Sequence, residues 1–194
     1  MYMHVPVKTL FEVSNLLSTD VEKRLVDLEA NGLYNFKLGA WERVDSYGLS
    51  KAPKLSTVIG NELVNYVMKQ FPGEHLFGWS LSMLPPGQQV LEHTDRMMFH
   101  RLARRVIVPV GPTKDVLNWS YASDKKTKRY YLLETGAAYQ LNTAITHGLS
   151  NNGSLPRRAV YFDVIDERLY QKFISHPDIM CVILKQNTGA VHVL

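Results

Sequence analysis

Between residues 75 and 164 the sequence is a succession of short apolar, β-branched or aromatic segments, closed by turns such as 85–87 (PPG) and 111–112 (GP). Short strands at this spacing are typical of a β-sandwich or a jelly roll. We therefore expect a mainly β protein with flanking helices, whose core is a double-stranded β-helix of the jelly-roll, cupin-like kind. The expected strands are residues 75–84, 88–93, 105–110, 116–122, 129–133, 138–141, 145–149 and 158–164.

The sequence before this region indicates helices. Thr19 and Glu22 form a capping box that opens a helix, which we expect to stop at Asn31-Gly32. A second helix is expected from about residue 57 to residue 71, because Pro72 cannot continue it.

One domain is expected from the length of 194 residues and from a hydrophobic content of 45%. Within residues 1–194, we expect residues 1–73 to be a helical N-terminal support and residues 74–166 to be the jelly-roll core. Residues 167–194 are a C-terminal extension whose first part looks helical, while residues 179–184 fit either a strand or a helix.

The sequence contains no signal for a membrane or for export. No apolar run approaches the roughly 20 residues of a membrane span, and residues 1–6 lack the basic and apolar parts of a signal peptide. The single Cys181 excludes an internal disulfide and suits a reducing compartment. We expect a cytoplasmic protein that does not contact a membrane.

The chain is mildly basic, with a net charge of +4 and an isoelectric point of about 9.1. Its basic residues are partly grouped, as in a nucleic-acid-binding surface. Two solvated loops that flank a hairpin explain the same grouping, and we favour this reading over a nucleic-acid partner. The groups are Arg101, Arg104 and Arg105, and Lys125, Lys126, Lys128 and Arg129.

His93 and Asp95 lie two residues apart on an extended segment, so both side chains point to the same face of a strand. His147 would have to come from another strand to complete a metal site. Two histidines and one carboxylate can hold one face of Fe(II) and leave the opposite face open to a co-substrate and O2. Arg157 follows closely, and its planar fork suits a carboxylate group of a co-substrate.

Other interpretations of these residues remain open. Each histidine alone is more often a hydrogen-bonded core residue than a metal ligand. A non-redox, metal-binding cupin, either an isomerase or a small-molecule binder, would use the histidines without needing Arg157.

Residues 82–93 (SMLPPGQQVLEH) resemble the strand, turn and strand that deliver the first iron histidine in the aspartyl/asparaginyl β-hydroxylase family. That family includes hydroxylases of free amino acids such as proline. Residues 134–143 (ETGAAYQLNT), His147, Arg157 and residues 160–164 (VYFDV) resemble the second half of its site. The resemblance covers roughly residues 76 to 166.

The resemblance implies roles for individual residues. His93, Asp95 and His147 match the iron ligands. Arg157 matches the arginine that binds the distal carboxylate of 2-oxoglutarate, while Ser82 and Arg105 match two further residues of the co-substrate pocket.

Two positions depart from the family pattern or stay ambiguous. The segment before Arg105 is slightly longer than in relatives, so Arg104 can take its place, and Ile107 stands where the family often has a histidine. Only one of Arg157 and Arg158 can face the pocket from a strand, and the spacing to Asp163 favours Arg157.

These observations predict an Fe(II)- and 2-oxoglutarate-dependent dioxygenase that hydroxylates an amino-acid side chain and releases succinate and CO2. Its cofactors would be Fe(II), 2-oxoglutarate and O2, and its partner a free amino acid or a residue in a peptide or protein. The presence of Asp95 favours hydroxylation over halogenation. Asn142 and Thr143 are candidates for orienting the ligands, and the alternative for Asn142 is that it is simply a turn residue. Candidates for lining the mouth are Arg96, Met97, Met98, Phe99, Trp41, Arg43, Trp79, Trp119, Tyr121 and Tyr131, with Arg96 or Arg43 as a clamp for a substrate carboxylate. For any one of Trp41, Trp79, Trp119, Tyr121 and Tyr131, a role in the core is favoured over a role at the mouth.

Overall fold

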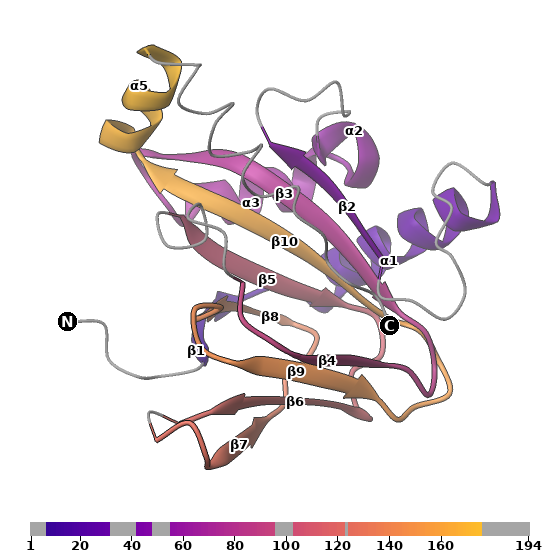
Figure 1. Cartoon of the computed structure of the whole chain (residues 1–194). Helices are drawn as coiled ribbons and strands as arrows, with labels where there is room; N and C mark the ends of the chain where they lie inside the picture. Colours follow the sequence, from indigo (N-terminus) through magenta and orange to yellow (C-terminus); the bar gives the residue numbers. More distant parts are fainter. Residues whose placement is uncertain (1–6, 32–41, 48–54, 96–102, 123, 176–194) are drawn as a thin grey trace.

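The computed structural model describes residues 7–31, 42–47, 55–95, 103–122 and 124–175. Two antiparallel sheets form the centre of the molecule, and helices lie on the far side of the larger one (Figure 1). The larger sheet has the strand order β1-β8-β5-β10-β3-β2, and the smaller has the order β4-β9-β6-β7. The expected mainly β, jelly-roll class is confirmed. In chain order the strands are β1 (Val7–Glu12), β2 (Glu42–Tyr47), β3 (Glu74–Leu84), β4 (Gln89–His93), β5 (Arg104–Val110), β6 (Val116–Tyr121), β7 (Lys128–Tyr131), β8 (Ala137–Leu141), β9 (His147–Asn151) and β10 (Arg157–Asp166).

Strand β10 lies near the middle of the larger sheet, between β5 and β3, and it is buried except at its last residue. Because side chains alternate along a strand, it separates two environments. Val160 and Phe162 face a core shared with the helices, whereas Ala159 and Tyr161 face the space between the two sheets. This alternation decides which residues of β10 can reach a site between the sheets.

The sequence predicts a helical N-terminal third, but this part of the chain also contains two strands. Strand β1 pairs with β8 and strand β2 pairs with β3, so this part of the chain supplies both edges of the larger sheet. Both segments carry several polar residues and show no clear apolar alternation. An edge strand is held largely by backbone hydrogen bonds to one neighbour, which leaves a weak signal in the sequence.

The first helix, α1 (Asn15–Ala30), begins earlier than predicted. Ser14 is its N-cap, and its hydroxyl oxygen accepts a hydrogen bond from the Leu17 N–H at 3.1 Å. The predicted cap, Thr19, therefore lies inside the helix. The predicted stop is confirmed, because Asn31 is the C-cap.

The second predicted helix is divided in two by Gly60. Its φ of +87° is a left-handed conformation that favours glycine, and it separates α2 (Leu55–Ile59) from α3 (Asn61–Lys69). The predicted helix after Asp166 is present as α5 (Glu167–Ser175). Residues 179–184 lie outside the described residues. No described helix combines the length and the apolar character that crossing a bilayer requires.

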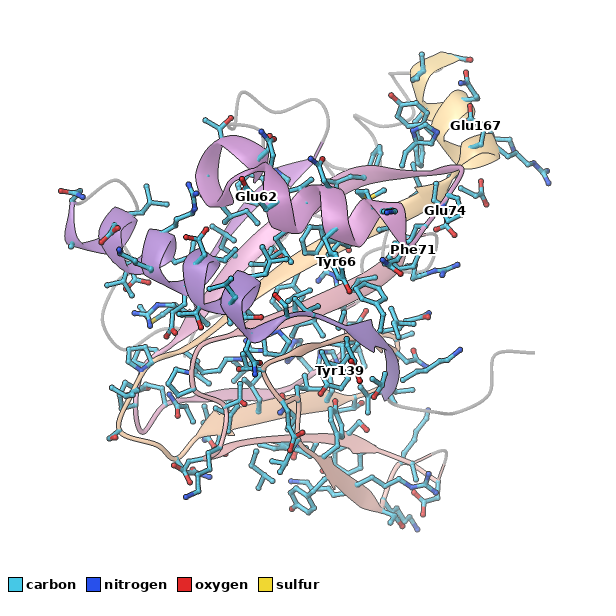
Figure 2. The ribbon with its side chains drawn as sticks, turned by 180° about the vertical axis from the view of Figure 1, so that it is seen from behind. Glu62, Tyr66, Phe71, Glu74, Tyr139 and Glu167 are labelled. Carbon is cyan, nitrogen blue, oxygen red and sulfur yellow. The ribbon has the colours of Figure 1, made fainter. Side chains whose placement is uncertain are left out.

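Helices α1, α2 and α3 cover one face of the larger sheet, as the view from behind shows (Figure 2). Tyr66 of α3 donates a hydrogen bond to the Glu12 carbonyl at 2.6 Å, and its ring meets Phe11 edge to face. These contacts dock α3 on strand β1. The core on this side of the sheet includes Val21, Leu25, Leu63, Val67, Val106, Val108, Val160 and Phe162.

Arg158 joins this helical layer to strand β10. Its guanidinium donates two hydrogen bonds to the Glu29 carboxylate, at 2.9 and 2.7 Å, and lies 3.6 Å from Glu22. Both glutamates belong to α1. Arg158 therefore points away from the space between the sheets, and its neighbour Arg157 points into it.

Replacing Arg158 by glutamine should lower the free energy of unfolding by about 2 kcal/mol, because two partly buried carboxylates lose their cation. Urea unfolding would measure this loss. Arg24→Gln is the control. Arg24 lies on α1, the helix that carries Glu22 and Glu29, and it pairs with Asp20 on the exposed surface, so its loss should lower the free energy of unfolding much less. Equal losses in both variants would contradict the role assigned to Arg158.

Candidate metal centre and its pocket

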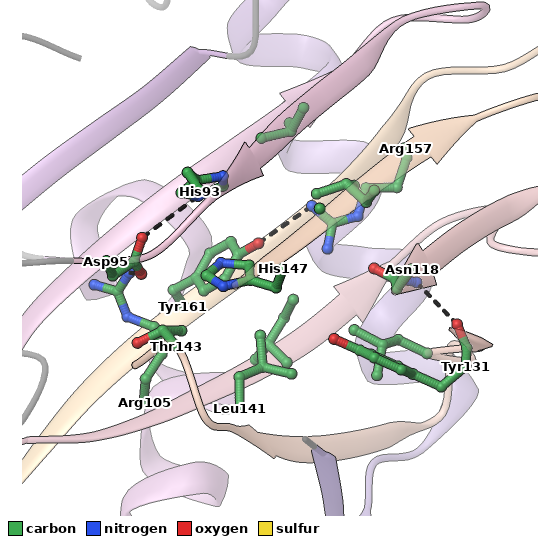
Figure 3. A pocket seen from close by; sticks show the side chains of 15 residues that line it. His93, Asp95, Arg105, Asn118, Tyr131, Leu141, Thr143, His147, Arg157 and Tyr161 are labelled. Atoms are coloured by element: carbon green, nitrogen blue, oxygen red, sulfur yellow. Dashed lines mark hydrogen bonds and ion pairs between the residues drawn. The ribbon is translucent and has the colours of Figure 1, made fainter. Parts of the chain in front are cut away.

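The structure brings together the three residues predicted to bind a metal. His93 ends β4 and His147 begins β9, and the two residues are register partners on adjacent strands. Their ring centroids lie 4.4 Å apart, and Asp95 follows just beyond β4 (Figure 3). One potential ligand atom from each of the three residues lies within 4.8 Å of the others. The group could therefore hold a single metal ion.

Both imidazole rings are oriented by backbone carbonyls. The Nδ1 atom of His93 lies 2.7 Å from the Leu91 carbonyl oxygen, and that of His147 lies 2.8 Å from the Ile145 carbonyl oxygen. Because a carbonyl oxygen only accepts, each Nδ1 carries the proton and donates. Each Nε2 therefore keeps a lone pair for a metal ion.

His147 is held in its neutral form. Burial lowers its pKa below the usual value of 6.5, and the neighbouring Asp95 carboxylate opposes this shift only in part. A neutral imidazole is the form that binds a metal ion. This ligand is therefore ready to bind at neutral pH without first losing a proton.

The position of Asp95 is set by its own backbone. Its N–H donates to the Thr143 carbonyl at 2.9 Å, which ties the segment after β4 to the segment before β9. Its Oδ1 atom lies 3.5 Å from Nε2 of His93. Thr143 thus orients a ligand through its main chain, whereas Asn142 accepts a hydrogen bond from the Ala144 N–H and forms a turn.

Arg157 lies in the same pocket, with its side chain almost fully buried. Its Nη1 atom donates to the Ser82 hydroxyl at 2.8 Å and to the Tyr161 hydroxyl at 3.4 Å. Among the residues that the structure describes, no carboxylate forms an ion pair with Arg157. A buried cation whose only described hydrogen-bond partners are neutral is unfavourable unless an anion joins it.

The pKa values of two tyrosines in this pocket shift in opposite directions. Burial raises the pKa of Tyr131 to about 12. Burial also acts to raise the pKa of Tyr161, but the charge of Arg157 and hydrogen bonds from Arg157 and Ser82 outweigh it and lower that pKa. The positive charge of Arg157 thus favours the ionised form of the neighbouring Tyr161 hydroxyl.

Arg105 lines the pocket, whereas its neighbour Arg104 turns away and pairs with Glu74 at 3.1 Å. This settles the ambiguity between the two arginines. The guanidinium of Arg105 donates two hydrogen bonds of 2.8 Å to the Asp163 carboxylate, and its Nη1 atom lies 3.3 Å from Oδ2 of Asp95. Sequence reasoning missed Asp163 as a site residue, although a charge inside an apolar strand was a usable signal.

Several residues predicted to line the mouth do not do so. Trp79 packs in the core on the helical side of the larger sheet. Trp119 and Tyr121 belong to the opposite face of the small sheet from the pocket, where Lys128 lies over both rings. Only Tyr131 of the described candidates lines the pocket. Trp41, the side chain of Arg43 and residues 96–99 lie outside the described residues.

Gly148 allows the small sheet to pack closely beside His147. A Cβ atom at this position would lie 2.7 Å from the Trp119 ring and 2.9 Å from the Val90 carbonyl oxygen. Neither neighbour is the end of a flexible side chain, and Val90 belongs to the strand that carries His93. Only glycine fits this contact without displacing a strand.

Gly148→Ala should therefore cost about 1–3 kcal/mol of folding free energy through overpacking and should weaken Mn(II) binding by shifting the two histidines. Thermal unfolding and a Mn(II) titration would measure both effects. Gly153→Ala serves as the control, because a Cβ there meets its neighbours at 3.3 Å, away from the histidines. Unchanged stability and Mn(II) affinity in the Gly148 variant would show that the two strands accommodate a Cβ atom there and that the contact does not set the positions of the histidines.

No family model matches this sequence, and no curated protein matches it. Among solved structures, the chain is similar to a Pseudomonas putida prolyl-4-hydroxylase, with a TM-score of 0.56 and 12% identity over 83% of this chain and 91% of that one. It is also similar to the non-heme monooxygenase ThoJ in a nickel complex, with a TM-score of 0.58 and 13% identity over 84% of this chain and 74% of that one. At these identities the likeness concerns the fold.

Proposed function

We propose that this protein is an Fe(II)- and 2-oxoglutarate-dependent dioxygenase that hydroxylates an amino-acid side chain. The observation that carries the proposal is the position of Arg157. A buried arginine without a described carboxylate partner shares one pocket with a group of two histidines and one carboxylate. The pocket therefore combines a metal-binding group with a site for an anion.

The donor set fits Fe(II). Two neutral imidazole nitrogens and one carboxylate are the ligands of non-heme iron oxygenases, which keep the remaining coordination positions open. When bound, the iron would supply the oxidative chemistry that a C–H bond requires. The chain contributes the preset Nε2 lone pairs of His93 and His147 and the carboxylate of Asp95.

The surroundings of Arg157 fit one carboxylate of a dicarboxylic acid. Arg157, Ser82 and Tyr161 would hold the distal carboxylate of 2-oxoglutarate, while its keto-acid end would face the metal ligands. Such a charge-assisted contact in a buried pocket fixes the co-substrate in one orientation. Without it, the buried charge of Arg157 would stay unneutralised by the described residues.

An amino-acid-like substrate, either free or within a peptide, is the proposed partner. The names of the two structural neighbours are those of oxygenases, and one of them is called a prolyl hydroxylase. Both therefore support oxidative chemistry for this fold, and the prolyl hydroxylase supports an amino-acid side chain as the target.

Succinate release tests the proposal. The Fe(II)-loaded protein in air should form succinate from 2-oxoglutarate, and one free amino acid or peptide in a screen should stimulate it. His147→Ala should abolish this release because the metal loses a ligand. If no succinate forms and 2-oxoglutarate does not raise the melting temperature of the Mn(II)-loaded protein, a non-redox metal-binding cupin would be the better description.

Arg157→Gln should separate co-substrate binding from metal binding. Truncating one partner of a buried charge pair costs about 2–5 kcal/mol, so 2-oxoglutarate affinity should fall by at least about 30-fold. Calorimetry on the Mn(II)-loaded protein would measure this fall. Arg104→Gln is the matched control, since Arg104 faces away from the pocket. Unchanged affinity in Arg157→Gln would remove the main support for a 2-oxoglutarate site.

A further inference from the structure

Asp163, Arg105 and Asp95 form a continuous chain of contacts that ends at the metal ligands. Asp163 is fully buried, the Arg105 side chain is 4% exposed, and the Asp95 side chain is 15% exposed. Nε and Nη2 of Arg105 donate to the two oxygens of Asp163, and Nη1 lies 3.3 Å from Oδ2 of Asp95. One guanidinium thus links a buried carboxylate to the candidate ligand.

The backbone fixes this linkage. Arg105 on β5 and Asp163 on β10 are register partners, and directly opposed residues in an antiparallel pair hold their side chains close together on one face. Because the guanidinium is planar and rigid, two hydrogen bonds to Asp163 also determine where Nη1 points. Arg105 therefore presents a fixed donor toward Asp95.

The two oxygens of Asp95 have different neighbours. Oδ2 faces Arg105, whereas Oδ1 lies beside Nε2 of His93. A carboxylate that can rotate freely presents either oxygen, or both, to a cation. The contact with Arg105 favours the one orientation that leaves Oδ1 on the side of the histidines.

The charges of the chain also matter. Beside Asp95 alone, the cation of Arg105 would neutralise the carboxylate and weaken its attraction for a metal ion. Asp163 balances Arg105, so the group of three keeps one net negative charge next to the neutral His147. Arg105 can therefore orient Asp95 without cancelling its charge.

We infer that Arg105 is a positioning residue for the metal ligand Asp95 and that Asp163 both holds Arg105 and balances its charge. This inference rests on the metal centre of the proposed function. It differs from the co-substrate role that the family resemblance implies for Arg105.

The Mn(II) affinity of the full chain tests the inference, measured by electron paramagnetic resonance of free Mn(II). Arg105→Gln and Asp163→Asn should each weaken Mn(II) binding by about 10- to 100-fold, the usual effect of losing a group that orients a ligand. The first variant makes the group of three more negative and the second makes it less negative, so a loss in both variants reports the orientation of Asp95 and not the net charge. Arg157→Gln is the matched control, because it removes the other buried arginine of the pocket and should not weaken Mn(II) binding. With Mn(II) saturating, 2-oxoglutarate affinity should fall in Arg157→Gln but not in Arg105→Gln.

Arg105→Lys provides a second variant in case Asp163→Asn does not fold. It keeps a cation opposite Asp163 but lacks the planar fork that reaches both carboxylates, so Mn(II) binding should still weaken. Unfolding of each metal-free variant in urea would check its fold.

Two results would overturn the inference. One is Mn(II) affinity in Arg105→Gln equal to that of the unmodified protein. The other is a loss of 2-oxoglutarate affinity in Arg105→Gln, at saturating Mn(II), as large as in Arg157→Gln. A third result concerns the metal centre itself. If the unmodified protein binds no Mn(II), or binds it equally well after His147→Ala, the proposed metal centre is wrong, and this outcome differs from the two above.

Discussion

The alternation of side chains along β10 is the constraint on which both the core and the site depend. The strand is buried on both faces between β3 and β5, so each of its residues must suit one of two environments. Val160 and Phe162 complete the core under the helices, while Arg157 and Tyr161 face the pocket. A shift of one residue in register would exchange these faces. It would place Arg157 against apolar side chains and Phe162 in the site.

The two buried arginines of the pocket differ in how their charges are balanced. Arg105 is bound by the fully buried Asp163 and also contacts Asp95, so its cation belongs to a group with a net negative charge. Among the described residues, the side chain of Arg157 donates hydrogen bonds only to hydroxyl groups. The pocket therefore attracts a cation at its histidine end and an anion at its Arg157 end. The proposed metal ion and dicarboxylate co-substrate would together satisfy both ends.

The sequence predicted most strands of the core because glycine and proline turns interrupt them visibly between residues 74 and 166. It did not predict β1 and β2, whose edge positions demand little apolar alternation. Thr19 and Glu22 match the local motif of a helix cap, whereas Ser14 makes the observed hydrogen bond. Local patterns cannot decide between two nearby caps when tertiary packing sets where the helix starts.

The pocket was predicted in part, and the errors follow from strand alternation. His93, Asp95 and His147 lie together as the spacing and the resemblance had indicated. Trp79 could have been excluded from the sequence, because it has the opposite parity to Ser82 on the same strand. The charge of Asp163 within an apolar strand marks it as unusual, but no local pattern shows that it pairs with Arg105 on another strand.

A crystal structure of the protein with Mn(II) and 2-oxoglutarate would test the central claim most directly. We expect Mn(II) on Nε2 of His93, Nε2 of His147 and one oxygen of Asp95, with the distal carboxylate of 2-oxoglutarate on Arg157 and Ser82. Metal bound elsewhere, or a distal carboxylate seated away from Arg157, would contradict it.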